Sequence, residues 1–410
     1  MSLQRSILCL ACALGLLTAF APASGAATRA ASATKSEHAD EIRQIVRDAM
    51  EQQHLKAVIV SVTVDGENVL TEAFGESLPG VPATTDMNFR NGAVAFAYIG
   101  NLLMQFVDEG KADLDDTIDQ WLPNVPDADQ VTLRMLANQT AGYPDFEQDP
   151  AWIAAYYANP FHSWTFEERL KYVEDQPRPF APGENWSYSH SNFMILGEAL
   201  SEIANQPLDT LLQKKVLGPL GLQHTVETET SEIPAPVLHT FSAERRDYLD
   251  VPSTTPFYED ETSWNTQWGT PMGANQTTTI DDMVKTAVAI GNGKLLSKAS
   301  FKAMTAPSLL GFGSRDPACA PECFPQTDAY NFGLGVVRTG KWIKQNPALT
   351  GSASVEGYLR SKKIAIAVVN TFDQAYFEDP DPSLPSNPSN VLFQKIGAAL
   401  APDDAPIPLS

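Results

Sequence analysis

The sequence contains little cysteine, little histidine and little positive charge, and each shortage excludes a class of function. Among 410 residues there are four cysteines, six histidines, and 28 Lys and Arg against 50 Asp and Glu, which gives a formal net charge of −22 at pH 7. Phosphate backbones and anionic membrane surfaces repel such a polyanion, so we expect no nucleic-acid partner. The histidines are scattered without His-x-x-x-His spacing, so we expect no metal site and no cofactor.

Long apolar runs are almost absent as well. The clearest run, Ile7–Phe20, is broken only by Thr18 and is followed by small residues up to Ala26, which is typical of a secretory signal peptide. We therefore predict a signal peptide over residues 1–26, a flexible linker over 27–37, and a secreted, periplasmic or cell-envelope location. A retained N-terminal anchor is the alternative. No later run reaches the roughly 18 apolar residues of a membrane span, so none is expected after signal cleavage.

Only two cysteines remain once the signal peptide is removed. Cys319 and Cys323 lie in the proline-rich segment 316–325, which is typical of a surface loop. In an oxidising compartment, two cysteines this close are expected to form a disulfide. The alternative, half of a metal site, needs further Cys or His ligands nearby, and the sequence has none there.

Strand patterns lie near the two ends of the chain, and helical patterns lie mostly between them. β-Rich runs at 57–64 and 68–74 flank Asp65-Gly66, which indicates a hairpin because glycine accepts positive φ. Apolar spacing predicts helices at 42–50, 92–109, 166–174, 193–204, 280–290 and 390–400, and strands at 332–339, 354–360 and 364–371. A glycine, Gly110, is expected to end the second of these helices.

This order of elements predicts an α/β fold with a single domain over residues 38–402. One antiparallel sheet is built from both chain ends, residues 38–92 and 330–402, and is flanked by helices. A mainly helical region, residues 93–329, is inserted between them. Residues 403–410 form a short tail.

Several short segments occur in an order that matches one protein family. From the N-terminus they are Phe89-Arg90-Asn91-Gly92, Leu102 to Lys111, Val131 to Leu136, Pro182-Gly183 with Tyr188-Ser189, Pro219 to Leu222, and Leu349-Thr350-Gly351-Ser352 before Gly357-Tyr358. In this order the chain resembles the serine β-lactamase and penicillin-binding-protein family over residues 40–400. The branch it resembles is that of class C β-lactamases, D-alanyl-D-alanine carboxypeptidases and related esterases. The resemblance implies the β-lactamase/transpeptidase-like fold and a substrate cleft.

The resemblance also implies catalytic residues that this chain has in part replaced. In the family, a serine opens the long helix and a lysine one turn later shares its proton, while a Tyr-x-Asn motif and a Lys- or His-Thr-Gly strand complete the site. The serine and lysine positions are Ala93 and Phe96 here. Tyr188 remains, but His190 replaces the asparagine of its motif and Leu349 replaces the basic strand residue.

The resemblance places a ligand-binding cleft at residues Ala93, Tyr188, His190, Leu349, Thr350, Gly351 and Ser352. The backbone N–H groups of Ala93 and Ser352 need no side chain, so a site that binds a carbonyl group can remain after the serine is lost. Phe96 and Leu349 would make this site drier. Tyr188 is either a hydrogen-bond donor or base, or a structural tyrosine. His190 is either a base near neutral pH or a hydrogen-bonded loop residue.

Three functional hypotheses follow from these residues. The first is a secreted pseudoenzyme that binds a small-molecule or peptide-like ligand, such as an acyl compound, with a protein partner as a further option. The second is an active esterase, amidase or D-alanyl-D-alanine carboxypeptidase-like hydrolase rebuilt around Tyr188, His190 and one of the serines at 187, 189 and 191. The third is an interaction module whose cleft is filled by Phe96.

Overall fold

The computed structural model describes residues 24–228, 230–319, 321–378 and 387–409. The predicted signal peptide lies almost entirely outside these residues, so it stays a prediction. Among the described residues, no helix is both long and apolar enough to cross a membrane.

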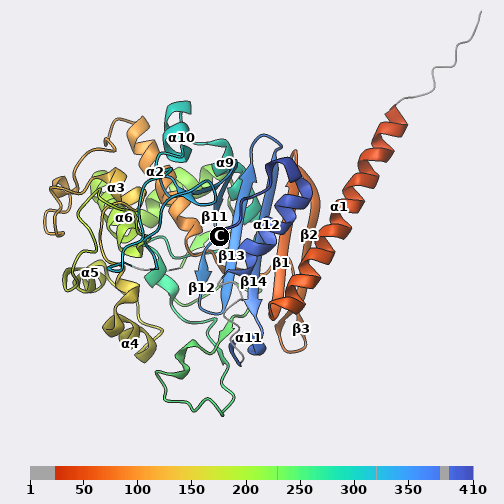
Figure 1. Ribbon diagram of the computed structural model, residues 1–410, viewed down its shortest axis with the longest axis horizontal. Coiled ribbons are helices and arrows are strands. Elements are labelled where there is room, and N and C mark those ends of the chain that lie inside the picture. The colour runs from red at the N-terminus through yellow and green to blue at the C-terminus, as the bar shows by residue number, and fades with distance from the viewer. Residues whose placement is uncertain (1–23, 229, 320, 379–386, 410) are drawn as a thin grey trace, which may run out of the picture.

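An antiparallel sheet made from both ends of the chain is the centre of the fold (Figure 1). Its strand order is β3-β2-β1-β14-β13-β11-β10-β9, and β12 pairs with β13. The strands are β1 Leu55–Val64, β2 Glu67–Leu78, β3 Val81–Pro82, β9 Asn331–Phe332, β10 Val337–Thr339, β11 Trp342–Gln345, β12 Ala348–Leu349, β13 Ser352–Leu359 and β14 Ile364–Phe372. The N-terminal β1 lies beside the C-terminal β14, which confirms the predicted sheet.

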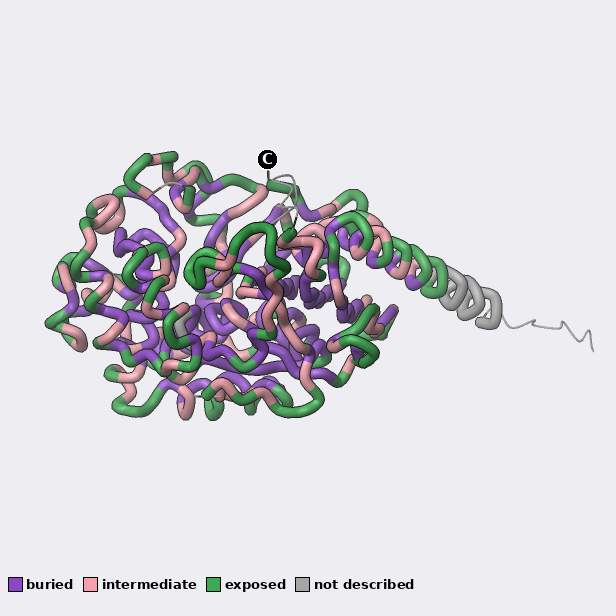
Figure 2. Tube along the Cα trace, turned by 90° about the horizontal axis from the view of Figure 1, so that it is seen from below, coloured by how far each residue is buried: buried purple, intermediate pink, exposed green. Residues whose placement is uncertain are grey.

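The two faces of the sheet enter two separate apolar cores, because alternate strand residues point in opposite directions. On one face, Val58 and Val368 belong to a buried cluster with Ile42 of α1 and Phe393 of α12 (Pro388–Leu400). On the other face, Ile59 joins the core of the helical region, where α9 contacts β1, β13 and β14. The buried segments in Figure 2 accordingly run through the middle of the molecule.

The N-terminal helix α1 spans Ser24–Gln52, so the expected flexible linker over residues 27–37 is wrong as a description of this segment. The segment is rich in alanine, which has the highest helix propensity of any residue, and helix formation therefore continues beyond the amphipathic part. The helix packs on the sheet through its C-terminal half, where Ile42, Val46 and Ala49 are fully buried.

The helical region covers the second face of the sheet (Figure 1). Its helices are α2 Val94–Asp108, α3 Leu133–Ala137, α4 Pro150–Ala158, α5 Phe166–Glu174, α6 His190–Ala204, α7 Leu208–Leu212, α8 Gly218–Leu220, α9 Ile280–Asn292 and α10 Lys298–Thr305; α11, Gln374–Glu378, follows β14. Short strands also occur there: β4 Phe89–Arg90, β5 Val226–Glu227, β6 Phe241–Ser242, β7 Glu259–Asp260 and β8 Gln276–Thr278. Helix α2 is the central one, and the predicted stop at Gly110 is confirmed by its φ of +65°.

The predicted strand at 332–339 is wrong, because the chain turns between β9 and β10. The turn is closed by a hydrogen bond from the N–H of Gly333 to the carbonyl of Val336 at 2.7 Å. A Cβ on Gly335 would lie 2.3 Å from the carbonyl oxygen of Phe96, so this glycine allows the turn to press against α2. The turn thereby fixes the position of α2 beside the sheet.

Candidate functional site

A cavity of about 230 Å³ opens beside the N-terminus of α2. The described residues that line it come from the turn before α2, the start of α6, the segments before β8 and β9, and the β11–β12 connection. They are Gly92, Ala93, Tyr188, His190, Gly269, Tyr330, Gln345, Asn346, Pro347, Ala348 and Leu349. The structure thus brings together Ala93, Tyr188, His190 and Leu349 of the residues expected from sequence.

The other three expected residues lie outside the lining of this cavity. Thr350 and Gly351 form the turn between β12 and β13, where Leu349 pairs with Ser352. Gly351 has a φ of +68°, and a Cβ there would lie 2.0 Å from Oε1 of Glu261. The turn therefore packs on the buried carboxyl of Glu261.

Ala93 and Phe96 make the α2 side of the cleft chemically inert. Ala93 precedes the first turn of α2 and contributes a methyl group, so no nucleophile stands at this position. Phe96 is fully buried and stacks on Phe193 of α6, with ring centroids 3.9 Å apart and an interplanar angle of 5°. It packs behind Tyr188 and His190, at 6.2 Å from each ring centroid, and the cavity beside it is open. The hypothesis of a cleft filled by Phe96 therefore finds no support.

Two tyrosine hydroxyl groups line the cleft, and both stay protonated at neutral pH. Burial raises the pKa of Tyr188 well above its usual value, and the neighbouring Tyr330, Glu147 and Asp145 raise it further. Burial likewise raises the pKa of Tyr330. With Phe96 in place of an amine, no ammonium at that position stabilises a phenolate. At neutral pH these phenols can therefore donate a hydrogen bond, and neither is a phenolate base.

His190 contacts two carboxylates that sequence reasoning missed. Its Nδ1 lies 2.9 Å from Oδ2 of Asp145 and 3.0 Å from Oε1 of Glu147. The side chains of Asp145 and Glu147 are only 6% and 10% exposed. Burial raises the pKa of Glu147 well above its usual value, the charge of Asp145 adds to this effect, and the cation of Arg169 opposes it.

The serines around Tyr188 hold this part of the cleft in place. Ser189 and Ser191 are fully buried. The hydroxyl of Ser191 donates to the carbonyl of Pro144 at 2.6 Å and accepts from the N–H of Phe146 at 3.3 Å, and the hydroxyl of Ser189 donates to Pro144 at 3.2 Å. These bonds tie the Asp145–Glu147 segment to the start of α6. Both hydroxyls are thus engaged in fixing the loop, which argues against either serine as a displaced nucleophile.

The residues lining the cleft or contacting His190 that the sequence did not reveal are Asp145, Glu147, Tyr330, Gln345 and Asn346. The only local signal for the first two is the Asp-x-Glu spacing within a loop, which is too common to indicate a site. Asp145 lies 45 positions before His190, so their contact depends on the tertiary fold.

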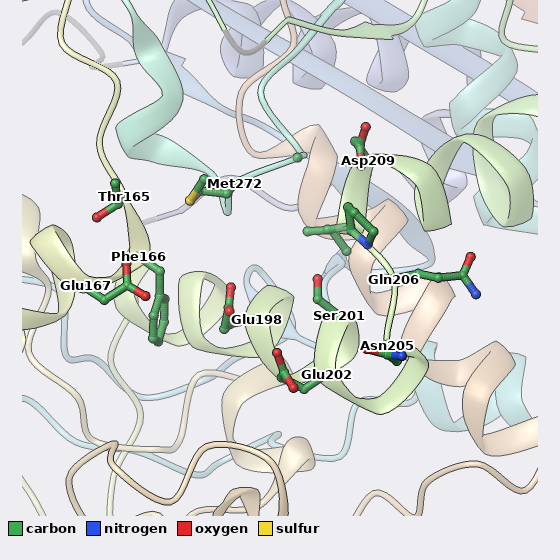
Figure 3. A pocket seen from close by; sticks show the side chains of 13 residues that line it. Thr165, Phe166, Glu167, Glu198, Ser201, Glu202, Asn205, Gln206, Asp209 and Met272 are labelled. Atoms are coloured by element: carbon green, nitrogen blue, oxygen red, sulfur yellow. The ribbon is translucent and has the colours of Figure 1, made fainter.

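A larger cavity of about 530 Å³ lies between α5, α6 and α7, away from the cleft (Figure 3). Glu167 of α5 and Glu198 and Glu202 of α6 line it together with Asp209. Burial raises the pKa of Glu198, and the charges of Glu167 and Glu202 raise it further. None of these residues belongs to the cleft beside α2.

The predicted disulfide is present. Cys319 and Cys323 are bonded, with Cα atoms 5.5 Å apart. Cys319 also lines a separate cavity of about 210 Å³, called here the cavity behind Tyr188, which Asp145 and Tyr188 line as well.

A family model matches most of the chain, and solved structures share its fold. The family model described as "Beta-lactamase" matches residues 42–381. The D-amino acid amidase of Ochrobactrum anthropi SV3, solved with L-phenylalanine amide, has a TM-score of 0.70 and 19% identity over 90% of this chain and 99% of that chain. A D-stereospecific amidohydrolase from a Streptomyces species has a TM-score of 0.68 and 22% identity over 82% of this chain and 94% of that chain.

A curated relative matches over a shorter region. The protein named "Putative D-alanyl-D-alanine carboxypeptidase" in Salmonella paratyphi A is 28% identical over 155 residues. The match covers 36% of this chain and about a third, 35%, of the relative's length.

Proposed function

Because this chain belongs to the β-lactamase family, we propose that it binds a small peptide-like or acyl ligand in the cleft beside α2 without forming a serine acyl-enzyme. The observation that carries this proposal is an open cavity of about 230 Å³ with the methyl group of Ala93 where the nucleophile is expected. Phe96, buried against Phe193, supplies no amine to activate a hydroxyl group nearby.

The lining of the cavity supports a ligand with one apolar part and a few polar groups. Tyr188 and Tyr330 present hydroxyl donors, while Asn346 and Leu349 lie on the β11–β12 side. The cavity is smaller than the roughly 300–1,000 Å³ typical of drug-sized ligands. Its size therefore favours a single amino-acid derivative or a short acyl group. The solved structures named above are a D-amino acid amidase and a D-stereospecific amidohydrolase, which makes a D-amino-acid amide the first class to test.

A secreted or cell-envelope location is part of the proposal. It is supported by the apolar run Ile7–Phe20 with small residues after it, and by the carboxypeptidase name of the curated relative. The net charge of −22 also favours neutral or cationic ligands over anionic ones. A protein partner in place of a small ligand is a further option within this proposal.

A second function, hydrolysis at a rebuilt site, is favoured by one observation. The Nδ1 of His190 lies within hydrogen-bond distance of Asp145, and a proton on Nδ1 leaves Nε2 as the acceptor. This is the arrangement in which a carboxylate orients a histidine base. The hydroxyls of Ser189 and Ser191 are engaged with Pro144, so such an enzyme would have to activate water.

Two measurements on the mature protein test the proposal. The first is intact mass after incubation with a penicillin and with a fluorophosphonate, next to an authentic serine β-lactamase as the labelled control. We expect no adduct. A stoichiometric adduct on a serine near Tyr188 would end the proposal and support the hydrolase.

The second measurement is calorimetric titration with D-phenylalanine amide. We expect binding that is lost in Ala348→Trp, because Ala348 is exposed at the cavity and an indole there blocks it. Ala151→Trp places the same side chain at an exposed position on α4 that lines none of the described cavities, and should leave binding unchanged. Turnover of the amide, followed by ammonia release, would favour the second function; binding that survives Ala348→Trp would exclude the cleft.

A further inference from the structure

Three metal-ligating side chains converge between the cleft and the cavity behind Tyr188. Nδ1 of His190, Oδ2 of Asp145 and Oε1 of Glu147 all lie within 4.8 Å of one another. Within the described parts of the chain, this is the one place where three His, Cys, Asp or Glu side chains meet in this way. This cluster adjoins the cleft, because His190 lines the cleft. Neither the matched family nor the names of the relatives assign an ion to the cluster.

One hydrogen on Nδ1 cannot serve both carboxylates. The nitrogen lies 2.9 Å from Asp145 and 3.0 Å from Glu147, and the hydrogen-bond geometry is met only toward Asp145. Oε1 of Glu147 is therefore buried without a hydrogen-bond donor, on a side chain that is 10% exposed. Leaving such an oxygen without a partner costs about 1–3 kcal/mol. A cation that accepts a lone pair from all three atoms removes this cost.

We propose that Asp145, Glu147 and His190 bind a divalent first-row transition-metal ion of the Zn²⁺ class. Oxygen and imidazole ligands suit this class, with metal–ligand bonds of about 2.0–2.2 Å. Two ligand atoms at such bond lengths are about 3.0–3.5 Å apart for bond angles between a right angle and the tetrahedral value. The two distances to Nδ1 reach the lower end of that range with little movement. Three protein ligands leave the remaining positions to water or a bound ligand.

The three ligands are held in place before any ion binds. Asp145 precedes the short 3₁₀ helix at Phe146–Gln148, and its carboxylate accepts the N–H of Glu147 at 3.3 Å. Phe146, between the two carboxylates, is fully buried and packs edge-on against Trp152 with centroids 5.4 Å apart. His190 is fixed as the first residue of α6. A preorganised ligand set of this kind loses little conformational entropy on binding.

Access and charge are consistent with an ion at this position. His190 lines the cleft and Asp145 lines the cavity behind Tyr188, so the cluster can be reached from two sides. Glu322 lines the same cavity as Asp145 and adds negative charge to the approach. The N-terminus of α6 and the cation of Arg169 oppose a metal ion, so both carboxylates are needed to outweigh them.

The inference goes beyond the proposed ligand binding in the cleft, and the two proposals are tested by separate experiments. Zn²⁺ is titrated into the chelator-treated mature protein by calorimetry. We expect saturable binding of one ion per chain. An absence of saturable binding would overturn the inference and leave the D-phenylalanine amide titration unaffected.

Variants locate the ion. Glu147→Gln keeps the shape of the side chain and should weaken Zn²⁺ binding by at least about tenfold, the lower end of losses seen even for outer-shell partners of metal sites. Glu198→Gln makes the same change in the acidic cavity of Figure 3 and should leave the affinity unchanged. His190→Asn removes the nitrogen ligand and should also weaken Zn²⁺ binding by at least about tenfold. Unchanged affinity in Glu147→Gln, or loss in Glu198→Gln, would contradict the site.

Folding of each variant is checked by its circular dichroism and thermal midpoint. If Glu147→Gln does not fold, His190→Asn is the variant that tests the site, because it changes a side chain that lines the cleft. Unaltered Zn²⁺ affinity in a folded His190→Asn protein would overturn the inference.

Discussion

The two sides of the cleft differ sharply in chemistry. The α2 side consists of Ala93 and the buried Phe96, which stacks on Phe193 with centroids 3.9 Å apart. The α6 side carries Tyr188 and His190, with Asp145 and Glu147 behind them. The serine and the lysine expected from the family are therefore absent from the α2 side, while the α6 side carries polar side chains. The cleft presents apolar groups from one side and polar groups from the other.

The largest expected effect comes from placing a charge on the α2 side. Phe96→Lys removes a fully buried ring and puts an ammonium group among aromatic side chains, so the free energy of unfolding should fall by at least about 3 kcal/mol. Urea unfolding measures this loss. Phe96→Leu, which keeps an apolar side chain, should lose only about 1.5 kcal/mol. A loss below about 1 kcal/mol in Phe96→Lys would show that the carboxylates of the α6 side accept the ammonium.

A smaller effect is expected from a carboxyl beneath the α2 side. Glu356 of β13 pairs in register with Gln345 and is 2% exposed, and burial raises its pKa to about 8 although Lys344 opposes the shift. The folded state therefore holds a proton that the unfolded state releases near pH 4.5. Between about pH 4.5 and pH 8 the folded state binds more protons than the unfolded state. The free energy of unfolding therefore falls as the pH rises through this interval.

Chemical unfolding between pH 5 and 7 measures this slope, below the interval in which Lys344, with its pKa lowered to about 7 by burial, adds a slope of opposite sign. The wild-type protein should lose free energy of unfolding on the order of 2 kcal/mol over this range, since one pKa unit corresponds to about 1.4 kcal/mol. Glu356→Gln should remove this loss. Glu174→Gln, at an exposed glutamate on α5, is the matched control and should keep the wild-type slope. An unchanged slope in Glu356→Gln would mean that this side tolerates a buried charge.

The smallest effect should come from a single donor on the α6 side. Tyr188→Phe removes one hydroxyl and should weaken binding of D-phenylalanine amide about fivefold, the equivalent of a hydrogen bond of about 1 kcal/mol. Titration calorimetry gives the affinity. Tyr248→Phe, at a tyrosine that is 42% exposed and lines none of the described cavities, should change nothing. Equal affinity in Tyr188→Phe would remove this hydroxyl from the recognition of the ligand.

The sequence predicted those parts of the fold that depend on local patterns. The hairpin at Asp65-Gly66 and the helix at 166–174 were expected from turn chemistry and apolar spacing, and both are confirmed. The linker over 27–37 was wrong because a low-hydrophobicity segment rich in alanine can still be helical. The strand at 332–339 was wrong because the close approach of Gly335 to α2 is a tertiary contact.

The site was predictable only where a family motif marks it. The resemblance located Ala93, Phe96, Tyr188 and His190, and the structure brings them together around the cleft. It did not locate Asp145 and Glu147, because nothing in the local sequence ties them to a histidine 45 residues away. The expectation of no metal site rested on histidine spacing. Spacing along the sequence does not detect ligands that the fold brings together from separate segments. That expectation stays a prediction, and the proposed ion would contradict it.

The stack of Phe96 on Phe193 has a consequence for engineering and for evolutionary reversibility. A serine at position 93 requires one small change at the edge of a cavity. A lysine at position 96 requires the partner ring at 193 to change as well, because the two rings lie face to face with an interplanar angle of 5°. Each single step toward an acyl-transfer site therefore passes through a protein that is either inert or less stable. The packing of the two rings therefore opposes a lysine at position 96.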